Sequence, residues 1–130
     1  MAIRGIRGAI SVSRNTKSEI IQATRRLLSR MVAANRIDVE EIASAIFSVT
    51  CDLDKEFPAI AARRLGWVYT PLLCTYEIDV EGGLPMCIRV LIHVNTEKKQ
   101  KEMKHVYLGK ARTLRPDLGN RRPGLYYLSS

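Results

Sequence analysis

The sequence predicts an α+β fold, in which helices pack on one face of a mixed β-sheet. Apolar residues recur at helical spacing through residues 20–34, whereas through residues 86–95 they alternate with other residues as in a half-buried strand. The predicted order is strand, helix, strand, helix and then consecutive strands. A sheet of about five strands is narrow, and oligomerisation is one way to cover its edges.

The N-terminal third should form a long strand followed by the main helix. Residues 3–12 are predicted to be extended, with glycines where the backbone could approach another group closely. The helix begins at a capping-box pattern, Thr16 to Glu19. It should end near Asn35, because asparagine tolerates the left-handed conformation of a helix C-cap.

A second strand and a short helix are expected next. A helical turn at residues 38–41 should lead into a strand at residues 45–49. The short helix should cover residues 57–65. Pro58 lies in its first turn, where a missing N–H costs nothing, and Gly66 ends it.

The C-terminal half should contribute three strands. Residues 71–80 and residues 86–95 are joined by a glycine-rich turn, and residues 106–114 form the last strand. Residues 1–118 are expected to form one domain, because a chain of 130 residues is long enough to bury a single core. The polar, Pro/Gly-punctuated residues 119–130 are expected to be a mobile tail.

Composition predicts a cytoplasmic protein that binds no membrane. No stretch approaches the roughly 20 apolar residues that cross a bilayer, and the N-terminus does not resemble a secretory signal. Three widely spaced cysteines without a CxxC pair predict reduced, mostly buried thiols rather than a zinc site or a disulfide framework.

The net charge of +8 is compatible with nucleic acid, an anionic membrane surface or an anionic small molecule as the ligand. The basic residues are dispersed, and no Lys/Arg stripe alternates with aromatic residues as a single-strand binding surface would require. Nucleic-acid binding is therefore permitted by the charge but not indicated by its distribution.

Arg89 is the most unusual residue of the chain. It lies inside the apolar strand predicted at residues 86–95, on the same face as Cys87. A guanidinium is always charged and needs an anion or several carbonyls in such a place. Glu77, on the preceding strand, comes close to Arg89 if the two strands pair. From the residues alone, a plain buried ion pair and a shared ligand pocket are equally good interpretations.

Other candidate residues suggest an anion site. Arg7 lies among bare backbone in the segment 5–8, where a ligand could approach, although an exposed strand arginine is a common alternative. Arg63, Tyr107 and Arg115 have weaker individual claims. GxSxG, Walker, GxGxxG and HExxH motifs are absent from the sequence, and neither histidine adjoins a Ser or Cys nucleophile. This inventory suggests electrostatic positioning of a polyanion rather than covalent catalysis.

Several separate motifs resemble the Bacillus-type chorismate mutases. The similarity runs from residue 2 to about residue 118, in the same order and at near-identical spacing. Agreement of several motifs is more specific than one short pattern. The motifs are Ile3-Arg4-Gly5-Ile6-Arg7-Gly8-Ala9, Phe57-Pro58-Ala59, Gly82-Gly83-Leu84, Cys87-Ile88-Arg89-Val90, His105-Val106-Tyr107-Leu108 and Leu114-Arg115-Pro116-Asp117-Leu118.

The resemblance implies a trimer with a pseudo-α/β-barrel, whose active sites lie in clefts between adjacent subunits. It implies an isomerase that rearranges chorismate to prephenate, on the route to phenylalanine and tyrosine, with no metal and no cofactor. The implied partners are chorismate, prephenate and further copies of the chain, but neither nucleic acid nor a membrane.

The resemblance also implies roles for individual residues. Arg89 is similar to the cation that faces the ether oxygen of the breaking bond, and Glu77 to the partner of the ring hydroxyl, so these two are the expected catalytic residues. Ile60 departs from the family, because some members carry a lysine there. The segment 65–67 is also one residue shorter than in the Bacillus form. The expected substrate-binding residues are Arg7, Leu73, Cys74, Thr75, Tyr76, Tyr107, Phe57, Ala59, Arg63 and Arg115.

The spacing of Cys74 and Glu77 favours a site between subunits. Three residues separate them, so on a regular strand they face opposite sides of the sheet. Both can contact ligand if they serve two different clefts, and a bulge is the alternative. The competing function from another class is a non-catalytic trimeric protein that binds anionic metabolites or RNA.

Overall fold

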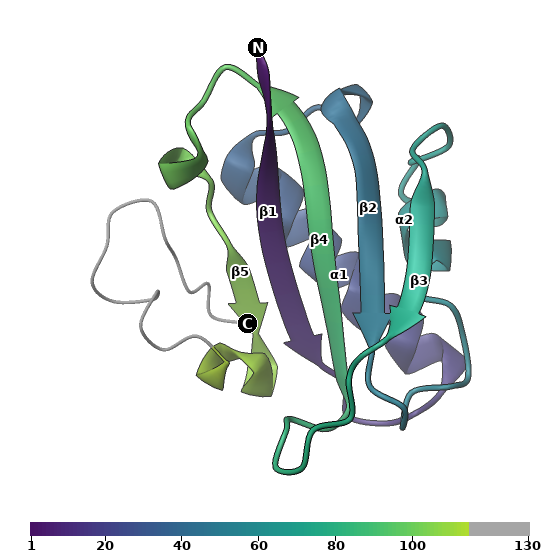
Figure 1. Cartoon of the computed structure of the whole chain (residues 1–130). Coiled ribbons are helices and arrows are strands. Elements are labelled where there is room, and N and C mark those ends of the chain that lie inside the picture. Colours follow the sequence, from purple (N-terminus) through teal and green to yellow (C-terminus); the bar gives the residue numbers. More distant parts are fainter. Residues whose placement is uncertain (115–130) are drawn as a thin grey trace.

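Residues 1–114 fold into one five-stranded sheet with two helices packed against one of its faces (Figure 1). The computed structural model describes residues 1–114. The predicted α+β class, with helices on one face of a mixed sheet, is confirmed. The strands are β1 (Ala2–Ser11), β2 (Ile42–Val49), β3 (Leu72–Tyr76), β4 (Cys87–Thr96) and β5 (Val106–Leu108), and the helices are α1 (Lys17–Asn35) and α2 (Ala59–Arg64).

The strand order of the sheet is β3-β2-β4-β1-β5. β4 lies at the centre and pairs antiparallel with β1 and β2, whereas the outer strands pair in parallel, β3 with β2 and β5 with β1. Residues 71–80 and residues 86–95, whose pairing the sequence left open, are therefore not neighbours in the sheet. Because parallel neighbours require a crossover connection, α2 carries the chain from β2 to β3, and the glycine-rich turn then leads to the far side of β2.

The core lies between the sheet and the helices. Four residues of β4 alternate onto the helix-facing side, and all of them are buried, which confirms the predicted strand face. Gly8 on β1 lets α1 approach closely, because a Cβ at this position would overlap the side chain of Met31. The four alternating residues are Ile88, Val90, Ile92 and Val94.

The structure confirms the predicted N-cap of α1 but not its predicted C-cap. The Thr16 side chain accepts a hydrogen bond of 3.1 Å from the backbone N–H of Glu19, as the capping pattern predicts. The left-handed residue is Arg36, with φ 51°, and not Asn35. Asn35 is buried, and its amide donates to the carbonyl of Lys104 (2.9 Å) and accepts from the Lys104 N–H (2.7 Å). This tertiary pairing explains why the asparagine stays inside the helix.

Other element boundaries also differ from the predictions. β2 begins at Ile42, earlier than the predicted 45, and β3 ends at Tyr76 rather than at 80. β5 ends at Leu108, because Gly109 takes φ 60° and turns the chain into a 3-10 segment, Gly109–Thr113, where a strand to 114 was predicted. The expected tail, residues 119–130, lies outside the described residues.

The face of the sheet opposite the helices is only partly covered. A small second cluster of buried residues lies where β5 and the 3-10 segment Gly109–Thr113 meet β1 and β4. Elsewhere large apolar side chains remain exposed, including Leu73 with 61% of its surface accessible. Within residues 1–114, no helix has the length and apolar character needed to cross a membrane. The buried cluster consists of Ala9, Cys87, Tyr107 and Ala111.

Candidate active site

A cavity of about 260 Å³ brings together four of the predicted site residues. Arg7 comes from β1, Arg89 from β4 and Tyr107 from β5, while Glu77 follows the last residue of β3. The strand order explains this meeting, because β4, β1 and β5 are neighbours and Glu77 reaches toward them from the other side of β2. The expected Arg115 lies outside the described residues.

Small neighbours leave space above the Arg89 guanidinium. In the ladder Arg89 lies opposite Ala9 of β1 and opposite Ser48 of β2. Both side chains are short, and both line the cavity. The Arg89 side chain keeps 43% of its surface accessible, so it is neither sealed in the core nor fully solvated.

The contact between Glu77 and Arg89 is a loose ion pair. The Nε of Arg89 lies 3.6 Å from the Oε1 of Glu77, which is too long for a hydrogen bond. This Nε is buried and makes no hydrogen bond within the described chain. A buried donor without an acceptor is unfavourable by about 1–3 kcal/mol, so the geometry calls for a further acceptor. Of the two interpretations left open by the sequence, the geometry favours a shared ligand pocket.

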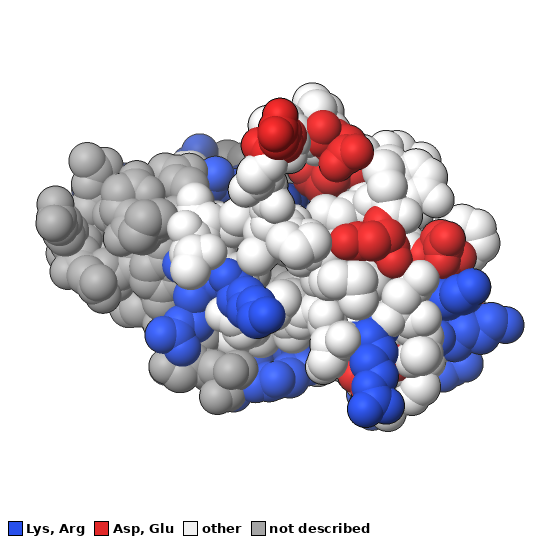
Figure 2. All heavy atoms as spheres, turned by 90° about the horizontal axis from the view of Figure 1, so that it is seen from below, with Lys and Arg blue, Asp and Glu red and all other residues white. Residues whose placement is uncertain are grey.

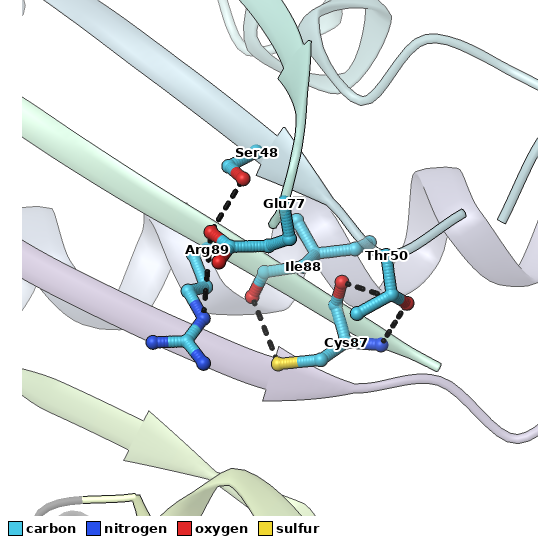
Figure 3. A network of polar contacts seen from close by, with 6 residues as sticks. All are labelled: Ser48, Thr50, Glu77, Cys87, Ile88 and Arg89. Carbon is cyan, nitrogen blue, oxygen red and sulfur yellow. Dashed lines mark hydrogen bonds and ion pairs between the residues drawn. The ribbon is translucent and has the colours of Figure 1, made fainter. Parts of the chain in front are cut away.

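Ser48 is a site residue that the sequence interpretation missed. Its hydroxyl donates a hydrogen bond of 2.5 Å to Oε1 of Glu77, as Figure 3 shows. Ser48 lies between the buried Phe47 and Val49, so it points to the same open face as Arg89. The alternation of residues 45–49 was the available signal, because a polar residue facing Arg89 across a strand pair is a candidate for the same site.

Cys87 lies beside the ion pair but is not a nucleophile. Burial raises the pKa of its thiol to about 11, against the lowering effect of the nearby Arg89 charge. The thiol is therefore neutral near pH 7, and only the thiolate is reactive. The Thr50 hydroxyl anchors this start of β4, since it accepts a hydrogen bond of 3.0 Å from the Cys87 N–H (Figure 3).

The remaining predicted residues lie elsewhere in the fold. Four of the predicted substrate-binding residues line a second cavity of about 260 Å³: Phe57, Cys74, Thr75 and Tyr76. Ala59 is buried at the start of α2, and the backbone there forms a hydrogen bond with the Cys74 thiol. A single chain therefore holds the predicted site residues in two groups.

Arg63 and Leu73 lie near the second group but do not line its cavity. The charge of Arg63, on α2, acts on the thiol of Cys74, although burial still raises the pKa of that thiol overall. Cys74 packs against the helix-side core, whereas Leu73 is exposed on the other face of β3. Cys74 and Glu77 face opposite sides of the sheet, as predicted, because Cys74 packs against the core while Glu77 lines the first cavity.

The surroundings of the site are acidic on one side. Figure 2 views the end of the molecule where β1, β2 and β3 finish; several Asp and Glu side chains lie close together there, and Lys and Arg side chains occupy other parts of the same view. Asp52, Glu77 and Asp79 line a neighbouring cavity of about 250 Å³. A phosphate backbone binds Lys and Arg side chains, so the acidic cluster itself does not favour nucleic acid.

The arrangement can bind an anion and stabilise developing negative charge. Two arginines and a buried tyrosine converge on one cavity, and the adjacent thiol is neutral. Among residues 1–114, no group of three or more His, Cys, Asp or Glu side chains is placed to hold a metal ion. Fold and site together define an α+β protein with an arginine-based site for an anionic small molecule.

Comparisons with known proteins identify the family. The family model for chorismate mutase type I matches residues 3–118, so the chain belongs to the type I chorismate mutase family. It is 48% identical over 119 residues to chorismate mutase AroH of Bacillus subtilis, covering 91% of this chain and 94% of that protein. It is 52% identical over 117 residues to chorismate mutase AroH of Thermus thermophilus, covering 89% and 96%.

A solved structure agrees with this assignment. The fold superposes on a chorismate mutase from Clostridium thermocellum with a TM-score of 0.83 and 53% sequence identity, covering 84% of this chain and 97% of that one. The resemblance inferred from the separate motifs is therefore confirmed.

Proposed function

We propose that the cavity holding Arg89, Glu77, Arg7 and Tyr107 is where this chorismate mutase converts chorismate to prephenate. Family membership supports the reaction, which belongs to aromatic amino-acid biosynthesis. The buried Nε of Arg89, which makes no hydrogen bond within residues 1–114, is the observation that supports the location.

The chemistry suits these side chains. Chorismate is a dianion, and its ether C–O bond breaks as a C–C bond forms in one pericyclic step, so negative charge builds on the ether oxygen. A guanidinium fixed at that oxygen stabilises the transition state more than the substrate. One donor of this kind is worth about 3 kcal/mol, or roughly 100-fold in rate. The step requires neither a nucleophile nor a base.

The other residues of the cavity would bind and orient the substrate. Arg7 and Tyr107 would hold a carboxylate, and Glu77 would accept a hydrogen bond from the ring hydroxyl; all three line the cavity, which supports these roles. Fixing the folded conformer of the substrate lowers the barrier by orientation. Because these contacts are also made in the ground state, we expect their loss to raise KM more than it lowers kcat.

We further infer that the complete site forms between copies of the chain, in a trimer. Each of the two cavities measures about 260 Å³, below the roughly 300–1,000 Å³ typical of ligand pockets, and each holds part of the predicted residues. Exposed apolar residues lie on the uncovered sheet face and at the rim of the second cavity, which is typical of subunit interfaces. They include Ile46, Phe57, Leu73 and Tyr76.

The reaction is tested by the loss of chorismate absorbance on addition of the purified protein without any cofactor. We expect turnover by the wild type and the loss of most turnover in Arg89→Lys, because a point charge cannot reproduce the planar guanidinium fork. Near-full conversion by Arg89→Lys would remove Arg89 from the proposed role. Arg7→Ala is expected to raise KM, and an unchanged saturation curve would contradict its carboxylate contact.

The shared site is tested by mixing two inactive variants. We expect Arg89→Ala to abolish activity through the first cavity, and Arg63→Ala, which removes the α2 charge beside Cys74, to abolish it through the second. In a ring of three that contains both variants, one site of the three combines two intact halves. Refolded mixtures should therefore regain activity that neither parent shows, with sedimentation confirming trimers. Mixtures as inactive as their parents would place the whole site within one chain.

A non-catalytic trimer that binds anionic metabolites or RNA is the second candidate, supported only by the net charge of +8. RNA binding should weaken steeply as salt rises, whereas turnover of a small dianion should not. We also infer a reducing, cytoplasmic setting, supported by three unpaired thiols, Cys51, Cys74 and Cys87.

A further inference from the structure

We propose that Ser48 is a positioning residue, which holds the Glu77 carboxylate away from the Arg89 guanidinium. This inference rests on the proposed function, because it concerns two side chains of the same site. It assigns to Ser48 the task of keeping the Arg89 charge available to substrate.

The geometry places the Glu77 carboxylate between Ser48 and Arg89. Ser48 lies directly opposite Arg89 in the β2–β4 ladder, and both line the cavity. One oxygen of Glu77, Oε1, accepts the Ser48 hydroxyl at 2.5 Å and lies 3.6 Å from Nε of Arg89. Figure 3 shows the carboxylate reaching over β2, with Ser48 on one side and Arg89 on the other.

Glu77 needs such an anchor because it has left its strand. β3 ends at Tyr76, and the backbone N–H of Glu77 still donates to the carbonyl of Val49 at 2.8 Å. This bond fixes the backbone of Glu77 but not the rotation of its side chain. The hydrogen bond from Ser48 fixes the carboxylate, and a hydrogen bond to a charged group is among the stronger ones.

Loss of that bond has a specific consequence. A carboxylate and a guanidinium form a direct hydrogen bond at about 2.7–2.9 Å, so Glu77 has less than 1 Å to move. Nε of Arg89 would then have its acceptor within the protein. The donor would no longer be free to meet negative charge on the substrate, and its positive charge would be partly compensated.

The substitution Ser48→Ala tests the proposal. We expect kcat to fall about tenfold, the effect of one charge-assisted hydrogen bond, while KM changes by less than about threefold. Ser48→Thr keeps the hydroxyl and suits a strand, so kcat should recover to within about threefold of wild type. Ser44→Ala is the matched control, because Ser44 lies on the same strand but bonds His93, at 3.1 Å, and should leave kcat unchanged.

A double-mutant cycle with Glu77→Gln separates positioning from packing. The neutral amide is not drawn onto Arg89, so Ser48→Ala should lower kcat by less than about twofold in the Glu77→Gln background. The crystal structure of Ser48→Ala should show the Arg89 to Glu77 distance shortened from 3.6 Å to hydrogen-bond length. Equal losses in both backgrounds, or an unchanged distance, would overturn the proposal.

The controls also distinguish this inference from the proposed function. If Glu77→Gln and Arg89→Lys lose activity while Ser48→Ala keeps it, only the role of Ser48 is wrong. If Glu77→Gln and Arg89→Lys both keep wild-type activity, the proposed site is wrong and the role of Ser48 with it.

Discussion

The backbone N–H of Arg7 donates a hydrogen bond of 2.9 Å to Nδ1 of His105, a buried histidine. β5 pairs with β1 only from Gly8 onward, so the edge of β1 before that point is completed by side chains. The Gln100 amide does the same for Gly5, accepting from its N–H at 2.8 Å and donating to its carbonyl at 2.7 Å. Side chains thus fix the backbone that carries the proposed carboxylate-binding arginine.

His105→Leu is expected to loosen Arg7. The substitution leaves a partly buried N–H without its acceptor, which should lower the free energy of unfolding by about 1 kcal/mol. Saturation kinetics should show KM for chorismate rising severalfold, with a smaller change in kcat. His105→Asn places an amide oxygen near the position of Nδ1 and should restore KM. A KM that stays high in His105→Asn, or stays normal in His105→Leu, would argue against this coupling.

Gly8→Ala is expected to destabilise the protein by overpacking. A Cβ there overlaps Sδ of Met31, whose side chain is fully buried, and touches Leu27. Extra atoms in a packed core are unfavourable by about 1–3 kcal/mol. Urea denaturation at one fixed protein concentration measures the loss.

Shortening the opposing side chain provides the control. Met31→Ala creates space at the same point, so the double variant Gly8→Ala/Met31→Ala should be less destabilised than the sum of the two single variants. If the two losses of unfolding free energy simply added, α1 and β1 would have room to move apart, and overpacking against Met31 would not be the cause.

The sequence indicated the strands and their buried faces better than it indicated which strands lie side by side in the sheet. The alternation of Ile88 and Val90 is contained in a few neighbouring residues, so β4 and its buried face were predictable. The sequence brought Glu77 close to Arg89 only if their two strands paired, and β3 and β4 do not pair. Glu77 reaches Arg89 over β2 instead, and such an arrangement depends on the crossover through α2 rather than on local sequence.

The missed residues share one physical cause. Ser48 and His105 act through hydrogen bonds to partners 29 and 98 positions away, and the residues next to them in the sequence, including the motif that His105 opens, do not indicate those partners. Arg36 takes the left-handed position expected near Asn35 for a similar reason, because the Asn35 amide pairs with Lys104, 69 positions away. Secondary-structure propensity is a property of a single residue type, whereas these roles depend on which distant segment of the chain packs beside the residue.

The Cys87 thiol should make stability fall at high pH. Its folded-state pKa is raised to about 11 by burial, above the ordinary value of 9.0. The unfolded chain therefore loses this proton first, and the stabilisation present below pH 9 is lost as pH rises toward 11. The group contributes roughly 2–3 kcal/mol to this fall, at 1.36 kcal/mol for each unit of pKa.

Comparison with Cys87→Ala isolates that contribution. Other groups titrate in the same range, but they are common to both proteins. The wild type should therefore lose more unfolding free energy than Cys87→Ala as pH rises from 8.5 to 11. Parallel stability curves over this range would mean that the thiol ionises as easily in the folded protein as in the unfolded one.

Arg36→Gly is expected to stabilise the end of α1. Arg36 takes φ 51°, and its N–H and that of Ile37 close the helix on the carbonyls of Ala33 (3.3 Å) and Val32 (3.1 Å). A left-handed residue with a Cβ is unfavourable by roughly 1–2 kcal/mol, whereas glycine has no such penalty but loses more backbone freedom on folding. The net gain should be about 0.5–1 kcal/mol in urea denaturation. Arg36→Ala removes the same charge but keeps the Cβ, so it should gain nothing; equal stabilisation by both variants would assign the effect to charge.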